Sequence, residues 1–331
     1  MEALLAVELP AGEGWQYEPK WDGFRCLARR DGGEVELISR NGKPLGRYFP
    51  ELVEALSALK EQRFLLDGEL IIPVGDALSF EALQLRLHPA ESRVRKLAAE
   101  TPSELMLFDL LSLGGKDHSA NPLSERRRAL ETFFASTNLP QLKLSPATTD
   151  RDTALGWLER SGGALDGVVA KRLDLPYKFG ERAMVKVKPE RTADCVVGGF
   201  RYATKTKLVG SLLLGLYDDS GLLDHVGFTS GIPAKEREKL TADLEALIDP
   251  PGFTGSKPGG PSRWKTHRAD QWKPLKPKLV VEVKYDQVTA NRFRHGTGLL
   301  RWRPDKNPRQ CTFDQLKPAL RPSQLREIFG T

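Results

Sequence analysis

The alternation of apolar and polar positions predicts two kinds of structure along the 331-residue chain. In the first half, residues 63–72 (RFLLDGELII) and 104–113 (ELMLFDLLSL) are apolar runs typical of strands with a buried face. Residues 49–60 (FPELVEALSALK) and 124–136 (SERRRALETFFAS) show helical periodicity instead. Strands interspersed with helices predict a mixed sheet flanked by helices.

From about residue 190 the pattern changes to short β-rich runs with one helix candidate at 234–248. The runs are DCVVGGF, SLLLGLY, LLDHVGF, KLVVEVKY and TGLLRWR. Such short strands, separated by turns, predict a small barrel of the oligonucleotide-binding type. Residues 249–277 are rich in Pro, Gly and charge, and we interpret them as a long, mobile, basic loop outside the core. The expected fold class is α+β, with domains at 1–191 and 192–331.

Composition narrows the class of protein. A net charge of +6 favours a polyanionic partner, and nucleic acid is the leading candidate. Cys26, Cys195 and Cys311 are too widely spaced for a paired metal motif and give no disulfide framework, which fits a reducing cytoplasm. The scattered histidines do not suggest zinc. No secretory signal and no run of about 20 apolar residues is present, so we expect a cytoplasmic protein without membrane association.

The segment EPKWDGFR (18–25) is the strongest chemical signal, because it places Lys20 just before an Asp-Gly pair. A lysine is a nucleophile only when neutral, and an ordinary pKa near 10.4 leaves roughly one lysine in a thousand neutral at physiological pH. Nearby cations and partial desolvation lower such a pKa, and Lys171, Lys186 and Lys188 are candidate cations. Taken alone, however, the four residues KWDG (20–23) are a weak signal of a nucleophile, since a lysine beside an Asp-Gly turn commonly faces solvent.

Two further segments suggest strands that carry lysines. Lys186 and Lys188 alternate with valines, so on a strand both would project from one face while the valines pack behind. The alternative is an exposed face of an edge strand. The apolar run 168–170 predicts a buried strand with Lys171 at its end.

Other polar and aromatic candidates have simpler alternatives when each is taken alone. Glu69 alternates with core leucines and could be a solvent-facing carboxylate. Arg40 lies in a polar turn where surface arginines are common, and Phe108 lies in an apolar run typical of a core.

Taken in order, these segments resemble the motifs of the covalent nucleotidyltransferase superfamily, and specifically those of short bacterial ATP-dependent DNA ligases. The resemblance runs from about residue 15 to about residue 306. It implies an ATP-grasp-like nucleotidyltransferase (adenylation) domain followed by an OB-fold β-barrel. The matching segments are EPKWDGFR (18–25), SRNGK (39–43), LLDGEL (65–70), MLFDLL (106–111), LDGVVAKR (165–172), MVKVKPE (184–190) and RHGTGLLRWRPDK (294–306).

The resemblance implies a role for each matched residue. Lys20 would be the adenylated nucleophile, Lys186 and Lys188 would meet the α-phosphate, and Asp22 would belong to the same catalytic group. Arg40 would contact the nucleotide sugar and the DNA end. The other nucleotide contacts would come from Glu18, Arg25, Glu69 at the ribose hydroxyl, Phe108 stacked on adenine, Lys171, and the R-x-D-K end formed by Arg303, Asp305 and Lys306.

Two positions leave the correspondence open. Asp166 stands where many relatives have glutamate, and together with Glu69 it is the expected metal ligand. Aspartate has a shorter reach, so it is open whether Asp166 binds metal directly or through water. Arg301 and Arg303 compete for the pyrophosphate role, and we favour Arg303 because it lies two residues before Asp305.

The implied reaction uses ATP with Mg²⁺ or Mn²⁺ to seal nicked duplex DNA. Lys20 would form lysyl-AMP, AMP would pass to a DNA 5′-phosphate, and the neighbouring 3′-hydroxyl would displace it. We expect a monomer that acts in DNA repair, with bacterial repair proteins as candidate partners. Residues 188–195 are the expected hinge, and the loop 256–278 with Arg201, Lys205 and Lys207 is the expected DNA-binding surface.

Three alternative functions fit part of the pattern. An RNA ligase or a GTP-using capping enzyme would share the lysine chemistry, although the predicted barrel disfavours the RNA ligases. A non-catalytic nucleic-acid-binding protein would share only the charge and the barrel.

Overall fold

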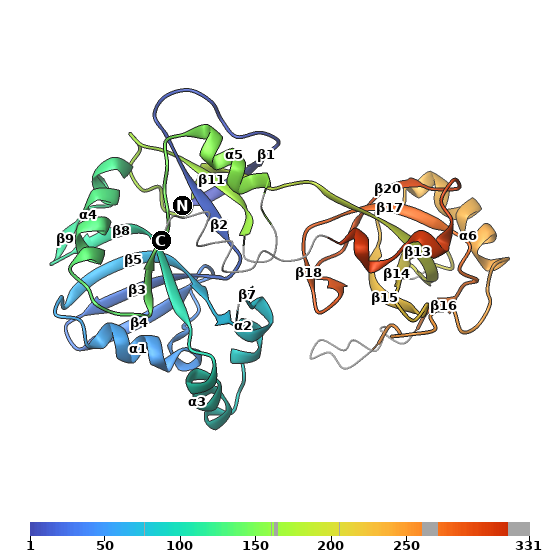
Figure 1. Ribbon diagram of the computed structural model, residues 1–331, viewed down its shortest axis with the longest axis horizontal. Coiled ribbons are helices and arrows are strands. Elements are labelled where there is room, and N and C mark those ends of the chain that lie inside the picture. Colours follow the sequence, from blue (N-terminus) through green and yellow to red (C-terminus); the bar gives the residue numbers. More distant parts are fainter. Residues whose placement is uncertain (76, 160, 162–164, 205, 260–270, 317–331) are drawn as a thin grey trace. The chain divides into compact units, whose positions relative to one another are not determined.

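The computed structural model describes residues 1–75, 77–159, 161, 165–204, 206–259 and 271–316. The chain divides into two compact units, shown in Figure 1. The first runs from Met1 to Pro189, and the second begins at Glu190 and includes the described residues up to 316. The division falls two residues before the boundary predicted at 191/192.

A six-stranded sheet forms one half of the first unit. Its strands are hydrogen-bonded in the order β10-β8-β5-β3-β4, and β9 pairs with β8. Their bounds are β3 (Phe24–Asp31), β4 (Glu34–Ser39), β5 (Arg63–Ile71), β8 (Glu104–Leu113), β9 (Lys116–Asp117) and β10 (Leu142–Leu144). β5 and β8 confirm the strands predicted at 63–72 and 104–113.

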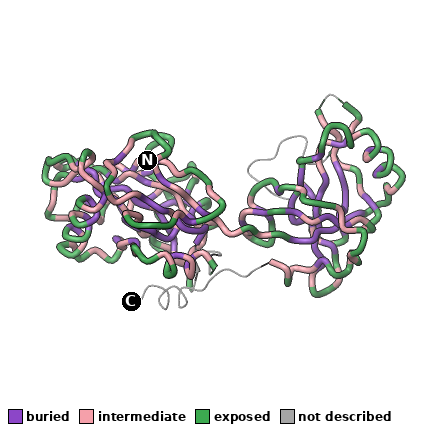
Figure 2. Tube along the Cα trace, turned by 90° about the horizontal axis from the view of Figure 1, so that it is seen from above, coloured by how far each residue is buried: buried purple, intermediate pink, exposed green. Residues whose placement is uncertain are grey.

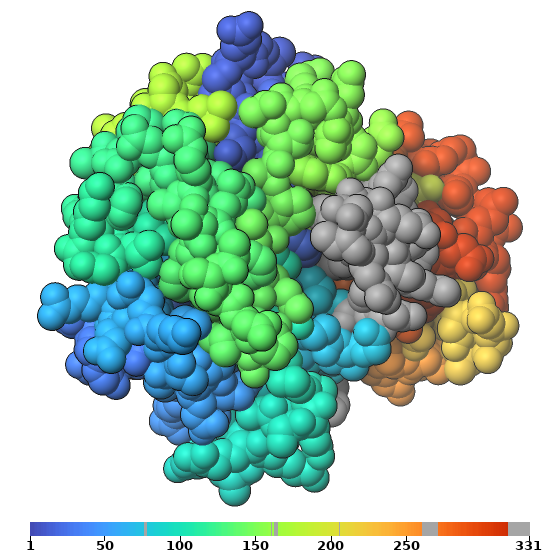
Figure 3. Space-filling model, turned by 60° about the vertical axis from the view of Figure 1, so that its left-hand side comes forward, coloured from blue at the N-terminus to red at the C-terminus, as the bar shows by residue number. Residues whose placement is uncertain are grey.

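Helices cover this sheet where the periodicity predicts them. α1 (Pro50–Ser57) contacts β4, and α4 (Leu123–Ala135) contacts β8 and β10. Leu52 and Leu56 of α1 and Leu130 of α4 are fully buried in the core beneath them. Shorter elements complete this region: η1 (Gly46–Tyr48), β6 (Pro73–Val74), β7 (Ala77–Leu78), α2 (Phe80–Arg86) and α3 (Glu91–Glu100). Segments coloured blue to yellow-green in Figure 3 form the surface of this unit on the face shown.

A four-stranded sheet in the order β1-β12-β11-β2 forms the other half of the first unit. Its bounds are β1 (Glu2–Ala6), β2 (Trp15–Trp21), β11 (Leu165–Arg172) and β12 (Arg182–Val187). α5 (Arg151–Glu159) packs against β2 and β11. Val187 and Ala170 are buried on that face, so the alternating residues on β12 and β11 turn to the opposite face. This confirms the strand predicted to carry Lys186, whereas Lys188 lies just after the end of β12.

The second unit is an antiparallel sheet in the order β15-β14-β13-β17-β20, with β16 paired to β13. Its strands are β13 (Arg191–Tyr202), β14 (Val209–Tyr217), β15 (Leu223–Thr229), β16 (Lys273–Pro274), β17 (Val280–Tyr285) and β20 (Gly298–Trp302). The remaining elements are η2 (Ala234–Glu236), α6 (Arg237–Glu245), β18 (Val288–Thr289), β19 (Arg292–Phe293), η3 (Pro308–Gln310) and η4 (Phe313–Gln315). The predicted strand runs and the helix within 234–248 are therefore confirmed. In each unit the buried residues concentrate on the central strands, as Figure 2 shows.

The prediction that 249–277 lies outside the core is wrong for Phe253 and Leu275. Phe253 and Leu275 are fully buried in the second unit. A side chain at Gly198 would lie 2.6 Å from the Phe253 ring, so this glycine leaves the space that the ring fills. Isolated apolar residues among prolines and glycines give no periodicity, which is why the pattern misses them. The predicted mobility concerns in part residues 260–270, which lie outside the described residues.

Candidate active site

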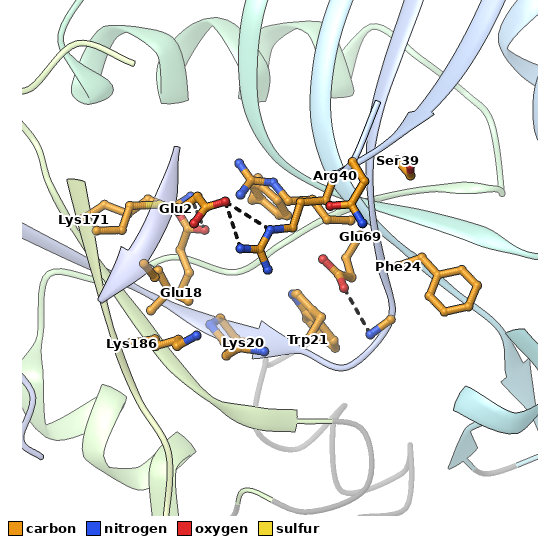
Figure 4. Close-up of a pocket in the computed structure, with 18 of the residues that line it drawn as sticks. Glu2, Glu18, Lys20, Trp21, Phe24, Ser39, Arg40, Glu69, Lys171 and Lys186 are labelled. Atoms are coloured by element: carbon orange, nitrogen blue, oxygen red, sulfur yellow. Dashed lines mark hydrogen bonds and ion pairs between the residues drawn. The ribbon is translucent and has the colours of Figure 1, made fainter. Parts of the chain in front are cut away.

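A cavity of about 480 Å³ opens in the first unit between its two sheets, and its size is that of an ordinary small-ligand site. Figure 4 shows Glu18, Lys20 and Lys186 on one side of this cavity, with Arg40 and Glu69 on the other. The cavity thus brings together most of the first-unit residues predicted to bind nucleotide. Its predicted lining residues are Glu18, Lys20, Arg25, Arg40, Glu69, Phe108, Lys171 and Lys186.

Lys20, Asp166 and Lys188 form an ion-paired group at one edge of the cavity. The Lys20 Nζ lies 2.5 Å from Asp166 Oδ2, and the Lys188 Nζ lies 2.9 Å from the same oxygen. Burial alone would raise the pKa of the Asp166 carboxyl, but the two ammonium groups outweigh it and hold the pKa below its usual range. One ionised carboxylate therefore holds two lysines together.

Lys186 adds a third cation from β12. Val169 of β11 is aligned with Lys186 on one side and with Glu18 of β2 on the other. This register places Glu18, Val169 and Lys186 in one row across the sheet. Burial lowers the pKa of Lys186, and the charges of Lys20 and Lys188 lower it further. Lys186 therefore lies within the field of the other two lysines.

A second charged pair lies deeper, beside Phe108. The Lys171 Nζ donates to Glu18 Oε2 at 2.7 Å, and the Gln16 amide donates to Glu18 Oε1 at 2.7 Å. The Lys171 Nζ also lies 4.7 Å from the centroid of the Phe108 ring. Phe108 lines the cavity and is only partly buried, so its ring is not a core residue alone.

Arg25 is fixed by residues that the sequence pattern does not single out. Its guanidinium donates to both carboxylate oxygens of Asp67, at 3.1 and 2.7 Å, and to the Tyr177 hydroxyl at 3.0 Å. The Tyr177 hydroxyl in turn donates to Asp67 at 2.7 Å. Burial alone would lower the pKa of Arg25, but the Asp67 carboxylate raises it above its usual value. Asp67 belongs to the LLDGEL segment and could have been noticed there, whereas nothing in the sequence around Tyr177 signals this contact.

Glu69 faces the cavity from β5 and is partly buried. Its Oε1 accepts from the Gly23 backbone N–H at 3.2 Å. A side chain at Gly23 would lie 2.1 Å from the Leu70 carbonyl oxygen, so only glycine permits this close approach. Burial raises the pKa of Glu69 to about 8, although Lys20 and Arg25 act in the opposite direction. Asp22, the neighbouring predicted residue, is buried and does not line the cavity.

Arg40 lies at the mouth of the cavity, in the turn after β4. Its Nη2 lies 2.8 Å from Glu2 Oε1, and the Arg40 side chain is 62% exposed. The exposed arginine can reach an incoming ligand without losing a buried partner.

The R-x-D-K residues lie in the second unit, and they gather around a carboxylate that the sequence analysis missed. Arg303 Nη1 lies 3.0 Å from Asp194 Oδ1, and the Lys306 Nζ lies 3.1 Å from Asp194 Oδ2. Arg303 also donates to Asp305 at 2.8 Å. Arg301 is instead paired with Glu282 at 2.5 Å and is 64% exposed. Asp194 sits in an apolar strand pattern, where a lone carboxylate gives no motif.

Comparisons with known proteins agree with the two units. The family described as the ATP-dependent DNA ligase domain matches residues 5–188, and the one described as the ATP-dependent DNA ligase C-terminal region matches residues 205–306. These matches confirm the predicted fold class, a nucleotidyltransferase domain followed by an OB-type barrel. None of the described helices is long and apolar enough to cross a membrane.

Individual relatives give the same result. The chain is 48% identical to DNA ligase C2 of Mycolicibacterium smegmatis over 92% of this chain and 90% of that protein. It is 45% identical to DNA ligase C of Mycobacterium tuberculosis, with the same coverage of both chains. A solved structure of a Lig E DNA ligase shares the fold, with a TM-score of 0.54 and 19% identity over 92% of this chain and all of the other. This chain therefore belongs to the ATP-dependent DNA ligases.

Proposed function

We propose that Lys20 is the residue that carries AMP during ligation. The observation that carries this proposal is the group formed by Lys20, Asp166 and Lys188, with Lys186 beside it. The Lys20 amine attacks the α-phosphorus of ATP, a P–N bond forms, and the bond from phosphorus to the pyrophosphate oxygen breaks. The Lys20 side chain is 26% exposed, so the proton that it gives up can pass to solvent.

The surrounding lysines stabilise the negative charge of the transferring phosphate. In phosphoryl transfer, a protein acts mainly by positioning groups and neutralising charge on the oxygens. Lys186 and Lys188 meet this need, since both belong to the same cationic group as Lys20. Asp22, which is buried directly after the nucleophile strand, belongs to the same catalytic group.

The adenosine part of ATP binds deeper in the same cavity. Phe108 stacks on the adenine, and the pair formed by Glu18 and Lys171 contacts the base edge, since both groups reach the cavity beside that ring. The Glu69 carboxyl accepts a hydrogen bond from the ribose hydroxyl, and Arg40 contacts the sugar from the mouth of the cavity. Arg25, held by Asp67, keeps the wall beside Phe108 rigid.

The carboxylates of the cavity fit a divalent cation that arrives with the ATP phosphates. Mg²⁺ is usually held by one or two carboxylates together with substrate phosphates and waters. Among the described residues no three acidic, histidine or cysteine side chains gather as a metal site, so the protein alone offers only this partial set. Asp166 would be the first ligand and Glu69, when ionised, the second. The cation, Mg²⁺ or Mn²⁺, would neutralise charge on the phosphates.

The later steps use DNA as the substrate. AMP passes from Lys20 to the 5′-phosphate at a nick, and the adjacent 3′-hydroxyl displaces AMP and closes the backbone. The second unit supplies Arg303, Asp305 and Lys306 for the pyrophosphate of ATP. It then contacts DNA phosphates through residues that include Arg201 and Lys207; Lys205 and 260–270 lie outside the described residues. Residues 188–195, which join the two units, are the proposed hinge.

The cellular setting is a further part of the proposal. A relative named as a multifunctional non-homologous end joining DNA repair protein, from Mycobacterium tuberculosis, is 29% identical over 94% of this chain and 37% of its own length. This similarity supports a role in DNA repair, with bacterial repair proteins as partners. We propose a cytoplasmic monomer that acts on nicked duplex DNA.

Covalent labelling tests the role of Lys20. The parent protein, Lys20→Ala and the control Lys116→Ala are incubated with Mg²⁺ and ATP labelled at the α-phosphate. Lys116 is exposed on β9, away from the cavity, so its variant should label like the parent. Lys20→Ala should take up no label and should not seal nicks. Label on Lys20→Ala at the parent level would overturn the assignment.

A further inference from the structure

Asp194 joins the two cations of the R-x-D-K end. It lies on β13, far along the chain from that end, and its side chain is only 11% exposed. Its carboxylate accepts from Arg303 Nη1 through both oxygens, at 3.0 and 3.2 Å, and contacts the Lys306 Nζ at 3.1 Å. Arg303 and Lys306 therefore share one nearly buried partner.

The backbone that carries this carboxylate is held in place. The Asp194 backbone N–H donates to Gln315 Oε1 at 3.0 Å, and the Gln315 amide donates back to the Asp194 carbonyl at 3.1 Å. Asp194 is paired with Glu282 of β17, and from Val196 onward β13 is also paired with β14. The backbone N–H of Arg303 donates to the Val280 carbonyl at 2.9 Å, so the backbone of Arg303 is fixed as well. The cluster is thus built on rigid elements and not on a loose surface contact.

The arrangement leaves both cations able to bind a further anion. Two like charges so close would repel each other without the carboxylate between them. Arg303 uses one edge of its guanidinium for Asp305 and one nitrogen for Asp194, and Lys306 uses one of its three N–H donors. Arg303 is 19% exposed and Lys306 26%, so each retains a face open to solvent.

We propose that Asp194 is a positioning residue that holds Arg303 and Lys306 side by side, as a pair that receives the pyrophosphate of ATP. This inference rests on the proposed role of the R-x-D-K end. Asp194 touches neither ATP nor DNA, and it acts through the two cations. Pyrophosphate is present only while lysyl-AMP forms or is reversed, so Asp194 matters in that step and not in the sealing of a nick that already carries AMP.

The test separates these two steps. Lysyl-AMP formation is measured in a single turnover with labelled ATP, and sealing is measured on a pre-adenylated nicked duplex with AMP-free protein and no ATP. Misplacement of a catalytic group by about 1 Å can cost about 100-fold in rate. We therefore expect Asp194→Asn to slow lysyl-AMP formation by about 10- to 100-fold, and to change the sealing of the pre-adenylated nick by less than about 2-fold.

Matched variants distinguish positioning from folding. Glu282→Gln removes a carboxylate of β17 that pairs with Arg301 of β20 and acts on Arg303 only through its charge, and it should change each step by less than about 2-fold. Asp194→Glu keeps the charge with a longer reach and should recover part of the lost rate, which a purely structural defect would not predict. If Asp194→Asn melts well below the parent, Asp194→Glu and a double-variant comparison decide the question. Adding Asp194→Asn to Arg303→Ala should then cost little more than Arg303→Ala alone.

Three results would overturn the inference: an unchanged rate of lysyl-AMP formation in Asp194→Asn, a faster rate, or an equal loss in both steps with unaltered melting. A faster rate would mean that Asp194 masks the cations from ATP. Failure of the underlying function looks different. If Arg303→Ala formed lysyl-AMP at the normal rate, the R-x-D-K end would have no role with pyrophosphate. If Lys20→Ala took up label, Lys20 would not be the nucleophile.

Discussion

Two places in the molecule use one carboxylate to hold two cations. In the first unit Asp166 lies between Lys20 and Lys188, and in the second unit Asp194 lies between Arg303 and Lys306. Both carboxylates are nearly buried, with side-chain exposures of 5% and 11%. The surroundings differ, because the first group lies at a cavity that a nucleotide would fill, whereas the second lies beside β13, outside that cavity.

This difference indicates how the same arrangement serves different steps. If Lys20 carries AMP as proposed, the carboxylate beside it should affect every step in which AMP is made, held or released. If Arg303 and Lys306 receive pyrophosphate as proposed, the carboxylate that orders them should affect only the step that involves pyrophosphate. We therefore expect substitutions at the two carboxylates to slow different steps of the reaction.

The largest expected effect comes from Asp166→Asn. Without the carboxylate, the Lys20 and Lys188 ammonium groups lose their common acceptor and repel each other. We expect lysyl-AMP formation to fall at least about 100-fold. Sealing of a pre-adenylated nick should fall as well, because AMP then occupies the same cavity.

Parallel single-turnover assays of Asp166→Asn and Asp194→Asn check this contrast. Glu282→Gln serves as the common control, since the nearest cation to its carboxylate is the exposed Arg301 and not Lys20, Lys188 or Lys306. If Asp166→Asn seals pre-adenylated nicks at the parent rate, the two carboxylates serve the same step and the comparison breaks down.

The sequence indicated much of the first site. Strand periodicity over 184–190 placed both lysines on one face, and the apolar run before Lys171 predicted its buried strand, because side-chain direction on a strand follows directly from the period of two. The helices at 49–60 and 124–136 were equally visible, since an amphipathic pattern spans several turns.

The partners of these residues were not visible, for physical reasons. Asp194 is separated by more than a hundred residues from Arg303, and only the pairing of β13 with β17, and of β17 with β20, brings them together. Tyr177 reaches Asp67 from a segment without periodicity. Phe253 enters the core because a glycine on β13 leaves room for its ring. Each contact depends on tertiary packing that no local pattern encodes.

A second prediction sharpens the comparison through Glu69, a carboxyl group near the first cation group. Burial raises its pKa to about 8 from the ordinary 4.5, so the lysine charges do not keep it ionised. Below pH 4.5 the group is protonated in both the folded and the unfolded chain. Between pH 4.5 and 8 only the unfolded chain ionises, so Glu69 lowers the free energy of unfolding progressively and the loss levels off above pH 8.

Glu69→Gln is neutral at every pH and can still accept from Gly23. One pKa unit corresponds to about 1.4 kcal/mol, and solvent contact reduces the full effect, so we expect Glu69→Gln to be more stable than the parent by about 2 kcal/mol at pH 8 and by almost nothing at pH 4.5. Denaturant unfolding of nucleotide-free protein at the two pH values measures this. Glu54→Gln, at an exposed position on α1, is the control and should show no such pH dependence. A Glu69→Gln protein that loses stability at pH 8 would mean that the carboxylate is ionised and paired.

The smallest effect concerns the geometry of the second group, and Arg303→Lys probes it. Arginine reaches Asp194 and Asp305 at once because its guanidinium is a planar fork, whereas a lysine ammonium is a single point of charge on a flexible chain. The variant keeps the positive charge but can hold only one of the two carboxylates well. We expect lysyl-AMP formation to slow by about 10-fold, which corresponds to about 1.4 kcal/mol, with no change in the sealing of pre-adenylated nicks. The matched variant Arg301→Lys changes an arginine on the same sheet that is ion-paired with Glu282 and contacts neither Asp194 nor Lys306, and it should retain the parent rate in both assays. Equal losses in the two arginine variants would show that the rate depends on arginine geometry near the end of β20 in general, and not on the fork held by Asp194 in particular.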